Sequence, residues 1–184
     1  FDTSFRTDAS QFDILTDEGD TLALGGITLT VMYVPGHTPA DMAYIATDDE
    51  KTVVFVGDTL FAPDVGTARC DFPGGDATTL YHSIKKLLAL PEDTMMYLCH
   101  DYPSKGRKHC PTTTVAAQKL GNIHLKDGIN EAEFVQMRER RDATLDMPRL
   151  IIPSVQVNID AGHFPEPEAN GIRYLKVPIN VLGQ

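Results

Sequence analysis

Two stretches of the chain place a metal-ligating side chain directly after a predicted β-strand: Val34-Pro35-Gly36-His37-Thr38-Pro39 and Phe55-Val56-Gly57-Asp58-Thr59-Leu60-Phe61. His37 follows a strand that ends at Val34, and Asp58 follows the β-branched run Thr52–Val56. Only one reversing strand, Met42–Ala46, lies between them, so the two flanking strands can run in the same direction. Both side chains are then expected at one edge of a sheet, in loops held by a rigid scaffold.

A third candidate ligand, His100, follows the strand predicted at Thr94–Cys99. Two imidazoles and a carboxylate together are typical ligands of a transition metal. Each of these three residues, taken alone, is more simply interpreted as a loop or turn residue. The hypothesis of a metal site therefore requires that their side chains lie close together in the fold. The other histidines are interpreted as structural or surface residues: His82, His109, His124 and His163.

The remaining pattern predicts a mixed α/β (α+β) domain, because strands are followed by alternating helices and strands. Phe12–Val34 favours β structure with a turn at Gly25-Gly26. From Pro148 onward, frequent prolines predict an extended, loop-rich tail. Three helices are expected: Ala77–Leu90 with Asp76 as its N-cap, a second from about Thr112 to Gly121, and a third from Asn130 to about Leu145.

Composition narrows the class of protein. The 184 residues are 42% apolar and 23% charged, which is ordinary for a packed domain rather than a disordered chain. A net charge of -10 repels phosphate backbones, so nucleic acid is not an expected partner. No run approaches the ~18 consecutive apolar residues of a membrane helix, so no membrane partner is expected either.

The three cysteines, Cys70, Cys99 and Cys110, contain no CxxC pair, which favours a reducing, cytoplasmic location over a disulfide scaffold. Cys70 and Cys99 are candidates for redox activity, although Cys99 ends an apolar strand and is expected to be a buried structural thiol. The first residues show no signal-peptide pattern. The chain starts with Phe1 rather than Met, so the expectation is that the beginning of the protein is missing.

The two opening stretches, taken together, resemble the second half of a metallo-β-lactamase-fold domain, and Cys99-His100-Asp101-Tyr102 resembles the next histidine motif of that family. Two further segments, Gly66–Phe72 and Thr79–Ser83, resemble the persulfide dioxygenase (ETHE1-like) branch and the bacterial β-lactamase-like hydrolases grouped with it. The similarity runs from about Gln11 to at least Arg107, and Ile151–Asn158 resembles the C-terminal extension of the bacterial members.

This resemblance implies an αββα sandwich of two packed sheets flanked by helices, of which the chain holds the C-terminal part. Residues 1–147 would form a partial domain, and residues 148–184 an extension packed on it. The upstream H-x-H-x-D-H motif of the family is absent from the sequence. The chain is therefore expected to be a fragment that is not a competent enzyme alone, with the sheet face of Ile27–Val34 and Thr52–Val56 left for another segment to cover.

The resemblance also implies one Fe(II) per subunit, held by two histidines and an aspartate, with His37 and Asp58 matching two of these ligands. His100 matches a second-metal ligand of dinuclear relatives, or a group beside the metal. Arg69 and Tyr102 match residues that hold the glutathione part of the substrate. The implied reaction, part of sulfide metabolism, oxidises glutathione persulfide with O2 to sulfite and glutathione, in a possible homodimer.

Two alternatives stay open. The first is a zinc-dependent thioester hydrolase of the glyoxalase II type, which shares the fold and the ligands that His37 and Asp58 resemble. The second is a non-catalytic fragment that packs but binds no metal. Metal content and the length of the intact protein distinguish the three.

Overall fold

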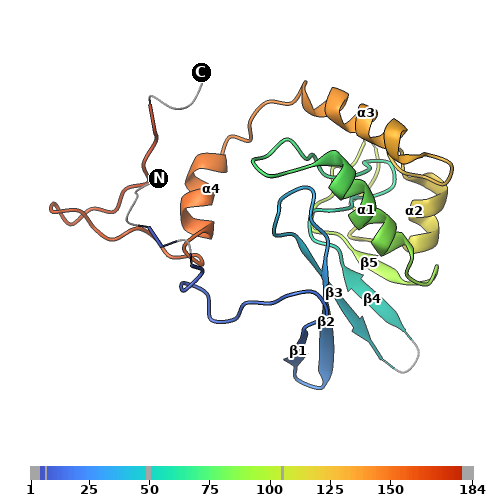
Figure 1. Cartoon of the computed structure of the whole chain (residues 1–184), viewed down its shortest axis with the longest axis horizontal. Coiled ribbons are helices and arrows are strands. Elements are labelled where there is room, and N and C mark those ends of the chain that lie inside the picture. Colours follow the sequence, from blue (N-terminus) through green and yellow to red (C-terminus); the bar gives the residue numbers. More distant parts are fainter. Residues whose placement is uncertain (1–4, 7, 49–50, 105, 180–184) are drawn as a thin grey trace. The chain divides into compact units, whose positions relative to one another are not determined.

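The computed structural model describes residues 5–6, 8–48, 51–104 and 106–179 (Figure 1). The chain divides into two units, one spanning Thr16–Leu145 and the other combining Phe1–Leu15 with Asp146–Gln184. The larger unit carries the sheet and the site residues predicted above. The expected division into residues 1–147 and 148–184 stays a prediction.

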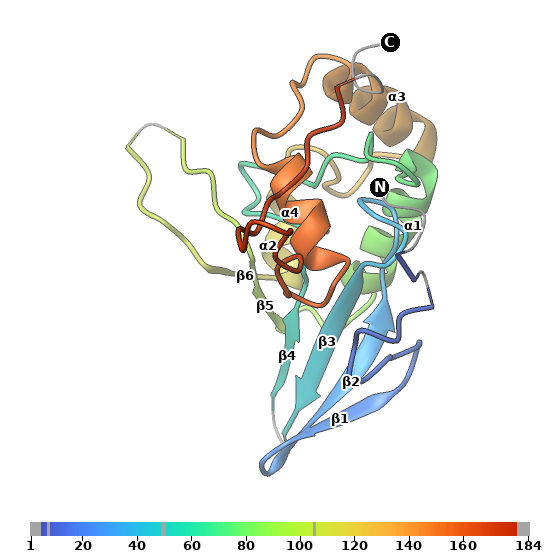
Figure 2. The ribbon, with the colours of Figure 1, turned by 90° about the vertical axis from the view of Figure 1, so that its left-hand side faces the viewer.

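The larger unit is built on a six-stranded sheet in which the strands lie in chain order (Figure 2). Every neighbouring pair is antiparallel except β4 and β5, which are parallel and joined through a helix. The strands are β1 (Thr21–Leu24), β2 (Ile27–Tyr33), β3 (Met42–Thr47), β4 (Thr52–Phe55), β5 (Met95–Tyr97) and β6 (Thr112–Thr114). The mixed α/β fold class is therefore confirmed.

Strand direction positions the site. β3 pairs antiparallel with both β2 and β4, so β2 and β4 run the same way, and β5 is parallel to β4. The predicted common direction of the strands before His37 and Asp58 is confirmed. The carboxyl ends of all three strands lie at one edge of the sheet, and His37, Asp58 and His100 follow those ends.

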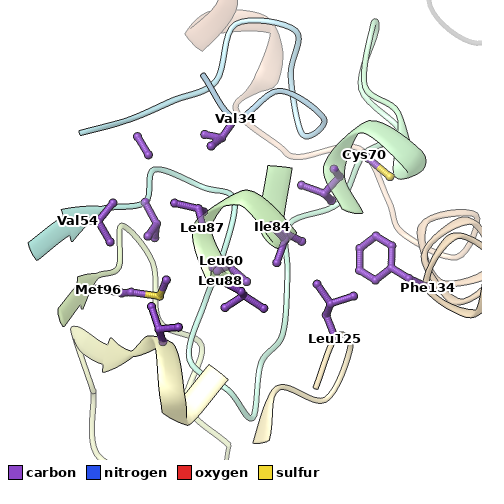
Figure 3. Packing of buried hydrophobic residues seen from close by; sticks show 14 of the residues in the cluster. Val34, Val54, Leu60, Cys70, Ile84, Leu87, Leu88, Met96, Leu125 and Phe134 are labelled. Carbon is purple, nitrogen blue, oxygen red and sulfur yellow. The ribbon is translucent and has the colours of Figure 1, made fainter. Parts of the chain in front are cut away.

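Helix α1 (Ala77–Leu88) begins where the sequence predicts. The Asp76 side chain accepts a hydrogen bond from the backbone N–H of Thr79 and so caps the first turn. The apolar stripe of α1 is buried against β4 and β5 in one core, part of which Figure 3 shows. Its members include Val54, Leu80, Ile84, Leu87, Leu88 and Met96.

Helices α2 (Val115–Gly121) and α3 (Glu131–Asp142) complete this unit. Asn130 and Glu133 form the predicted capping box of α3, and Phe134 is fully buried in the core. The expected helix start near Thr112 is wrong, because the β-branched Thr112–Thr114 pair with β5 as strand β6. Thr114 then caps α2 by accepting from the N–H of Ala117.

The tail is not wholly extended, which corrects the prediction from its prolines. Ile151–Asn158 form helix α4, and Pro153 is its third residue. A proline is compatible with that place because the first N–H groups of a helix have no partner within the helix. Residues 159–179 contain no helix or strand. In the part of the chain that the structure describes, no helix is long and apolar enough to cross a membrane.

The sheet has a second apolar face, opposite the one that packs on α1. Tyr44, Phe55 and Tyr97 share one register row, and their side chains alternate with those of the core. The rings of Phe55 and Tyr97 stack with centroids 5.1 Å apart, yet both side chains are exposed. Strands β2 and β4 contribute to this face, which is expected to be covered by another segment.

Candidate metal site

His37 lies in the loop between β2 and β3, and tight packing on α1 fixes this loop. Gly36 has φ +137° and its carbonyl accepts a hydrogen bond from the N–H of Asp76, 2.9 Å away. A Cβ at Gly36 would overlap the backbone of Leu80, so only glycine allows the loop to approach the helix this closely. The loop therefore presents His37 from a rigid base.

The orientation and tautomer of the His37 ring follow from one hydrogen bond. Its Nδ1 lies 2.6 Å from the carbonyl oxygen of Arg69. A carbonyl can only accept, so Nδ1 carries the hydrogen, and Nε2 of the neutral ring keeps its lone pair. The ring also packs against Phe72 with centroids 5.1 Å apart. His37 is thus arranged as a ligand whose Nε2 is the donor atom.

The Asp58 carboxylate lies between two imidazoles. Its Oδ2 is 3.9 Å from Nε2 of His37, and its Oδ1 is 3.2 Å from Nε2 of His100. Oδ1 is buried and has no hydrogen-bond partner among the described residues. Although His100 lies near this oxygen, a buried carboxylate oxygen that accepts no hydrogen bond is costly unless a further group binds it. The structure therefore brings all three predicted ligand residues together.

His100 belongs to a more open side of the site. Its side chain is half exposed, and its ring lies near those of Phe61 and Tyr102, with centroids 6.3 and 6.0 Å apart. The rings of Phe61 and Tyr102 meet edge to face at 5.6 Å. Tyr102 is exposed. His100 therefore lies in a cluster with these two aromatic rings.

The donor set of His37 and Asp58 fits a transition metal. Imidazole nitrogen and carboxylate oxygen suit iron and zinc alike, and Oδ1 of Asp58, which accepts no hydrogen bond from the described residues, is an atom that a cation can bind. Within the described ranges, however, no group of three or more His, Cys, Asp and Glu side chains is arranged to hold a metal ion. These residues thus offer part of a ligand set.

Arg69 is held beside the site by Asp71. Its Nε and Nη2 donate to the two carboxylate oxygens of Asp71, each at 2.6 Å, and its guanidinium lies 5.0 Å from the Phe72 ring centroid. The hydrogen bonds from Arg69 lower the pKa of Asp71 and raise that of Arg69. The guanidinium of Arg69 is therefore held in place by Asp71, while the backbone carbonyl of the same residue contacts His37.

A buried polar network that the sequence does not predict lies behind this loop. Arg138 and Asp142 of α3 form an ion pair, and both reach the segment Thr67–Cys70. Their spacing of four residues is typical of an ion pair within one helix. Such pairs usually lie on the solvent-exposed face of a helix, so the sequence does not indicate that this one is buried. Nδ1 of His124 accepts from the N–H of Thr67 at 3.0 Å, and burial lowers the pKa of His124 to about 4.

The cysteines are placed differently from the prediction. Cys99 is exposed and Cys70 is buried, so the expectation of a buried structural thiol at Cys99 is wrong. The register explains the difference: Met96 occupies the core face of β5, and only a three-residue strand forms there. Burial, and next the charge of Asp142, raise the pKa of Cys70 to about 12, so this thiol stays protonated and is a poor nucleophile.

Comparison with known proteins gives a consistent family signal. Residues 4–100 match the Metallo-beta-lactamase superfamily. A probable metallo-hydrolase of Burkholderia pseudomallei is 55% identical over 185 residues, which cover 97% of this chain and 63% of the relative. Glyoxylase B2 of Dictyostelium discoideum is 51% identical over 98% of this chain and 61% of its own length. Human mitochondrial persulfide dioxygenase ETHE1 is 37% identical over 85% of this chain and 57% of its own.

A solved structure supports the same fold. ETHE1 from Myxococcus xanthus superposes with a TM-score of 0.73 at 34% sequence identity, over 84% of this chain and 63% of that one. The chain spans about three-fifths of the length of the first two curated relatives.

Proposed function

Because the chain belongs to the metallo-beta-lactamase superfamily, we propose that it is part of a persulfide dioxygenase-like metalloenzyme. In this proposal the whole protein oxidises glutathione persulfide with O2 to sulfite and glutathione. One observation carries the proposal: Nε2 of His37 and the carboxylate of Asp58 converge, with a buried Oδ1 of Asp58 that no hydrogen bond satisfies. The kinship with persulfide dioxygenases of human and bacterial origin supports it.

His37 and Asp58 are the proposed metal ligands of this chain. The carbonyl of Arg69 holds His37 in the tautomer that keeps Nε2 available, and β4 delivers Asp58 to the same edge. Fe(II), when bound, supplies the activation of O2, which amino-acid side chains cannot provide. The missing ligand is proposed to come from a segment of the whole protein, since the relatives are longer than this chain.

Arg69 and Tyr102 are the proposed contacts of the glutathione part. A substrate carboxylate meets a guanidinium whose plane Asp71 and Phe72 already fix, so little rotamer entropy is lost on binding. The exposed phenol of Tyr102, whose ring lies near that of His100, can donate one further hydrogen bond. Together these groups would orient the outer sulfur toward His37 and Asp58.

A zinc-dependent thioester hydrolase is the second candidate, and the place of His100 favours it. Its Nε2 lies closer to Asp58 than that of His37 does, so the carboxylate has an imidazole on each side, a donor arrangement suited to two metal ions. The relatives with the higher identities are a glyoxylase and a probable metallo-hydrolase. In this candidate His100 is a ligand rather than a neighbour of the site.

One set of measurements separates the candidates. The full-length protein is purified, its intact mass and metal content are determined, and O2 uptake with glutathione persulfide is compared with cleavage of S-lactoylglutathione. We expect about one iron per subunit and O2 uptake that is lost in Asp58→Ala. Asp127→Ala, which removes an exposed carboxylate, is the control and should retain uptake.

Two results would count against the dioxygenase. Two zinc ions with thioester cleavage would establish the hydrolase instead. A protein with neither metal nor either activity would establish the non-catalytic alternative.

A further inference from the structure

We infer that the buried ion pair of Arg138 and Asp142 in α3 positions His37 by clamping the backbone of residues 67–70. The inference rests on the proposed function, in which Nε2 of His37 binds the metal. Arg138 and Asp142 would be positioning residues, because neither contacts Asp58 or the open side of the site. They act through the carbonyl of Arg69.

The Asp142 carboxylate joins the helix to the loop with both oxygens. Oδ1 accepts from Nε of Arg138 at 3.0 Å and from its Nη2 at 2.6 Å. Oδ2 accepts from the backbone N–H of Cys70 at 2.9 Å, and the thiol of Cys70 lies at 3.4 Å. The side chains of Arg138 and Asp142 are only 1% and 4% exposed. The carboxylate is thus held by two residues and has no freedom to turn toward solvent.

Arg138 holds the other end of the same segment. Its Nη1 donates to the carbonyl of Thr67 at 3.2 Å and lies 3.3 Å from the Thr67 hydroxyl. His124 accepts from the N–H of Thr67 and so fixes that peptide from a second direction. The segment from Thr67 to Cys70 is therefore fixed at its first and last residues by one ion pair.

His37 is the next group along this path. The clamped segment contains the carbonyl of Arg69, which lies 2.6 Å from Nδ1 of His37. The peptide that carries this carbonyl continues into the N–H of Cys70, which Asp142 binds. A rotation of that peptide would move both groups at once. The N–H bond to Asp142 consequently fixes the direction in which the carbonyl faces the imidazole.

Energetics favour a positioning role over a purely stabilising one. A buried ion pair gains little net stability over a well-packed apolar pair, because desolvation offsets the attraction. The ion pair instead fixes the orientation of the backbone groups that it binds, because hydrogen bonds are strong only over a narrow range of angles. The high pKa of the Cys70 thiol is consistent with this, because a protonated thiol can also donate to Asp142. Figure 3 shows Cys70 and the α3 residue Phe134 at the same side of the core.

The test uses the histidine resonances of the full-length protein without metal. Nitrogen chemical shifts distinguish a ring with its hydrogen on Nδ1 from one with its hydrogen on Nε2. In the wild type we expect the Nδ1–H form of His37, assigned by comparison with His37→Gln. In Asp142→Asn the Nε2–H form should gain population, and metal binding measured by titration should weaken by about 10- to 100-fold.

Glu139→Gln is the matched control, because it removes an exposed carboxylate from the same helix, and it should leave the His37 shifts and metal binding unchanged. Arg138→Lys is the second variant, used if Asp142→Asn does not fold. Lysine keeps the positive charge beside Asp142 but cannot also reach Thr67. We therefore expect a smaller gain of the Nε2–H form of His37 and a smaller loss of metal binding than in Asp142→Asn.

The outcomes are distinguishable. A folded Asp142→Asn or Arg138→Lys protein with wild-type His37 shifts would overturn the inference, even with a lowered melting temperature, because that is the result of a merely structural pair. An equal change in Glu139→Gln would also overturn it. If the wild type binds no metal, the proposed function fails, while the His37 tautomer still decides whether the clamp exists.

Discussion

Stability should fall on acidification because of His124. His124 is 6% exposed and its ring accepts a hydrogen bond from the N–H of Thr67, so the folded protein holds it neutral. Burial is the main cause of its pKa of about 4, the charges of Arg138 and Arg141 lower it further, and Asp142 opposes them. In the unfolded chain the pKa returns to its ordinary 6.5. The unfolded state therefore binds more protons between these two pH values, and folding loses free energy there as the pH falls.

The magnitude follows from the two pKa values. The loss expected from these two values grows to about 3 kcal/mol near pH 4. By pH 5.5 the loss should be about 1–2 kcal/mol, and only above about pH 7.5, where His124 is neutral in the unfolded chain as well, should this contribution be constant.

The assay is urea unfolding at several pH values between 4.5 and 7.5. The quantity compared is the free energy of unfolding of wild type minus that of His124→Gln, which removes the contributions of all other groups. His163→Gln is the control, since its imidazole is in an exposed loop. A wild-type minus His124→Gln difference that does not change with pH would refute the reasoning, as would a slope that disappears in His163→Gln.

Three further outcomes are expected. Phe134→Ala should lower the free energy of unfolding by about 3–5 kcal/mol in urea titrations, because the ring is fully buried, whereas the exposed Leu120→Ala should change it by less than about 0.5 kcal/mol. Gly36→Ala should unfold more easily and lose metal binding, since its Cβ meets the backbone of Leu80; Gly26→Ala, with open space around it, is the control, and equal effects would contradict the packing argument. Cys70 should stay unmodified by iodoacetamide at pH 8 in the folded protein while the two exposed cysteines react, and mass spectrometry showing its rapid labelling would contradict its burial.

Much of the sheet could be predicted from the sequence because it depends on local signals. Alternating side chains and the Gly25-Gly26 turn define the first hairpin, and one reversing strand suffices to place His37 and Asp58 at the same edge. Helix α1 was predictable for the same reason, since its cap and its apolar stripe lie within the helix.

The rest depends on contacts that the sequence does not display. Pro153, taken alone, predicts that no helix continues through this position, yet a proline is compatible with the first turn of α4. Burial of the Arg138–Asp142 pair depends on a loop about 70 residues earlier in the chain, and no periodicity within α3 reveals it. Cys99 was misplaced because strand β5 ends at Tyr97, earlier than its apolar composition suggests.

The bond between Cys70 and Asp142 also bears on the order of folding. It joins residues 72 positions apart, whereas the pairings of β2, β3 and β4 join strands that are neighbours in the chain. Contacts that close small loops form early, and those that close large loops wait for a greater loss of chain entropy. During synthesis β1 to β4 emerge before α3 exists. The surroundings of His37 are therefore completed only when α3 docks, so the proposed metal site would take its final form late in folding.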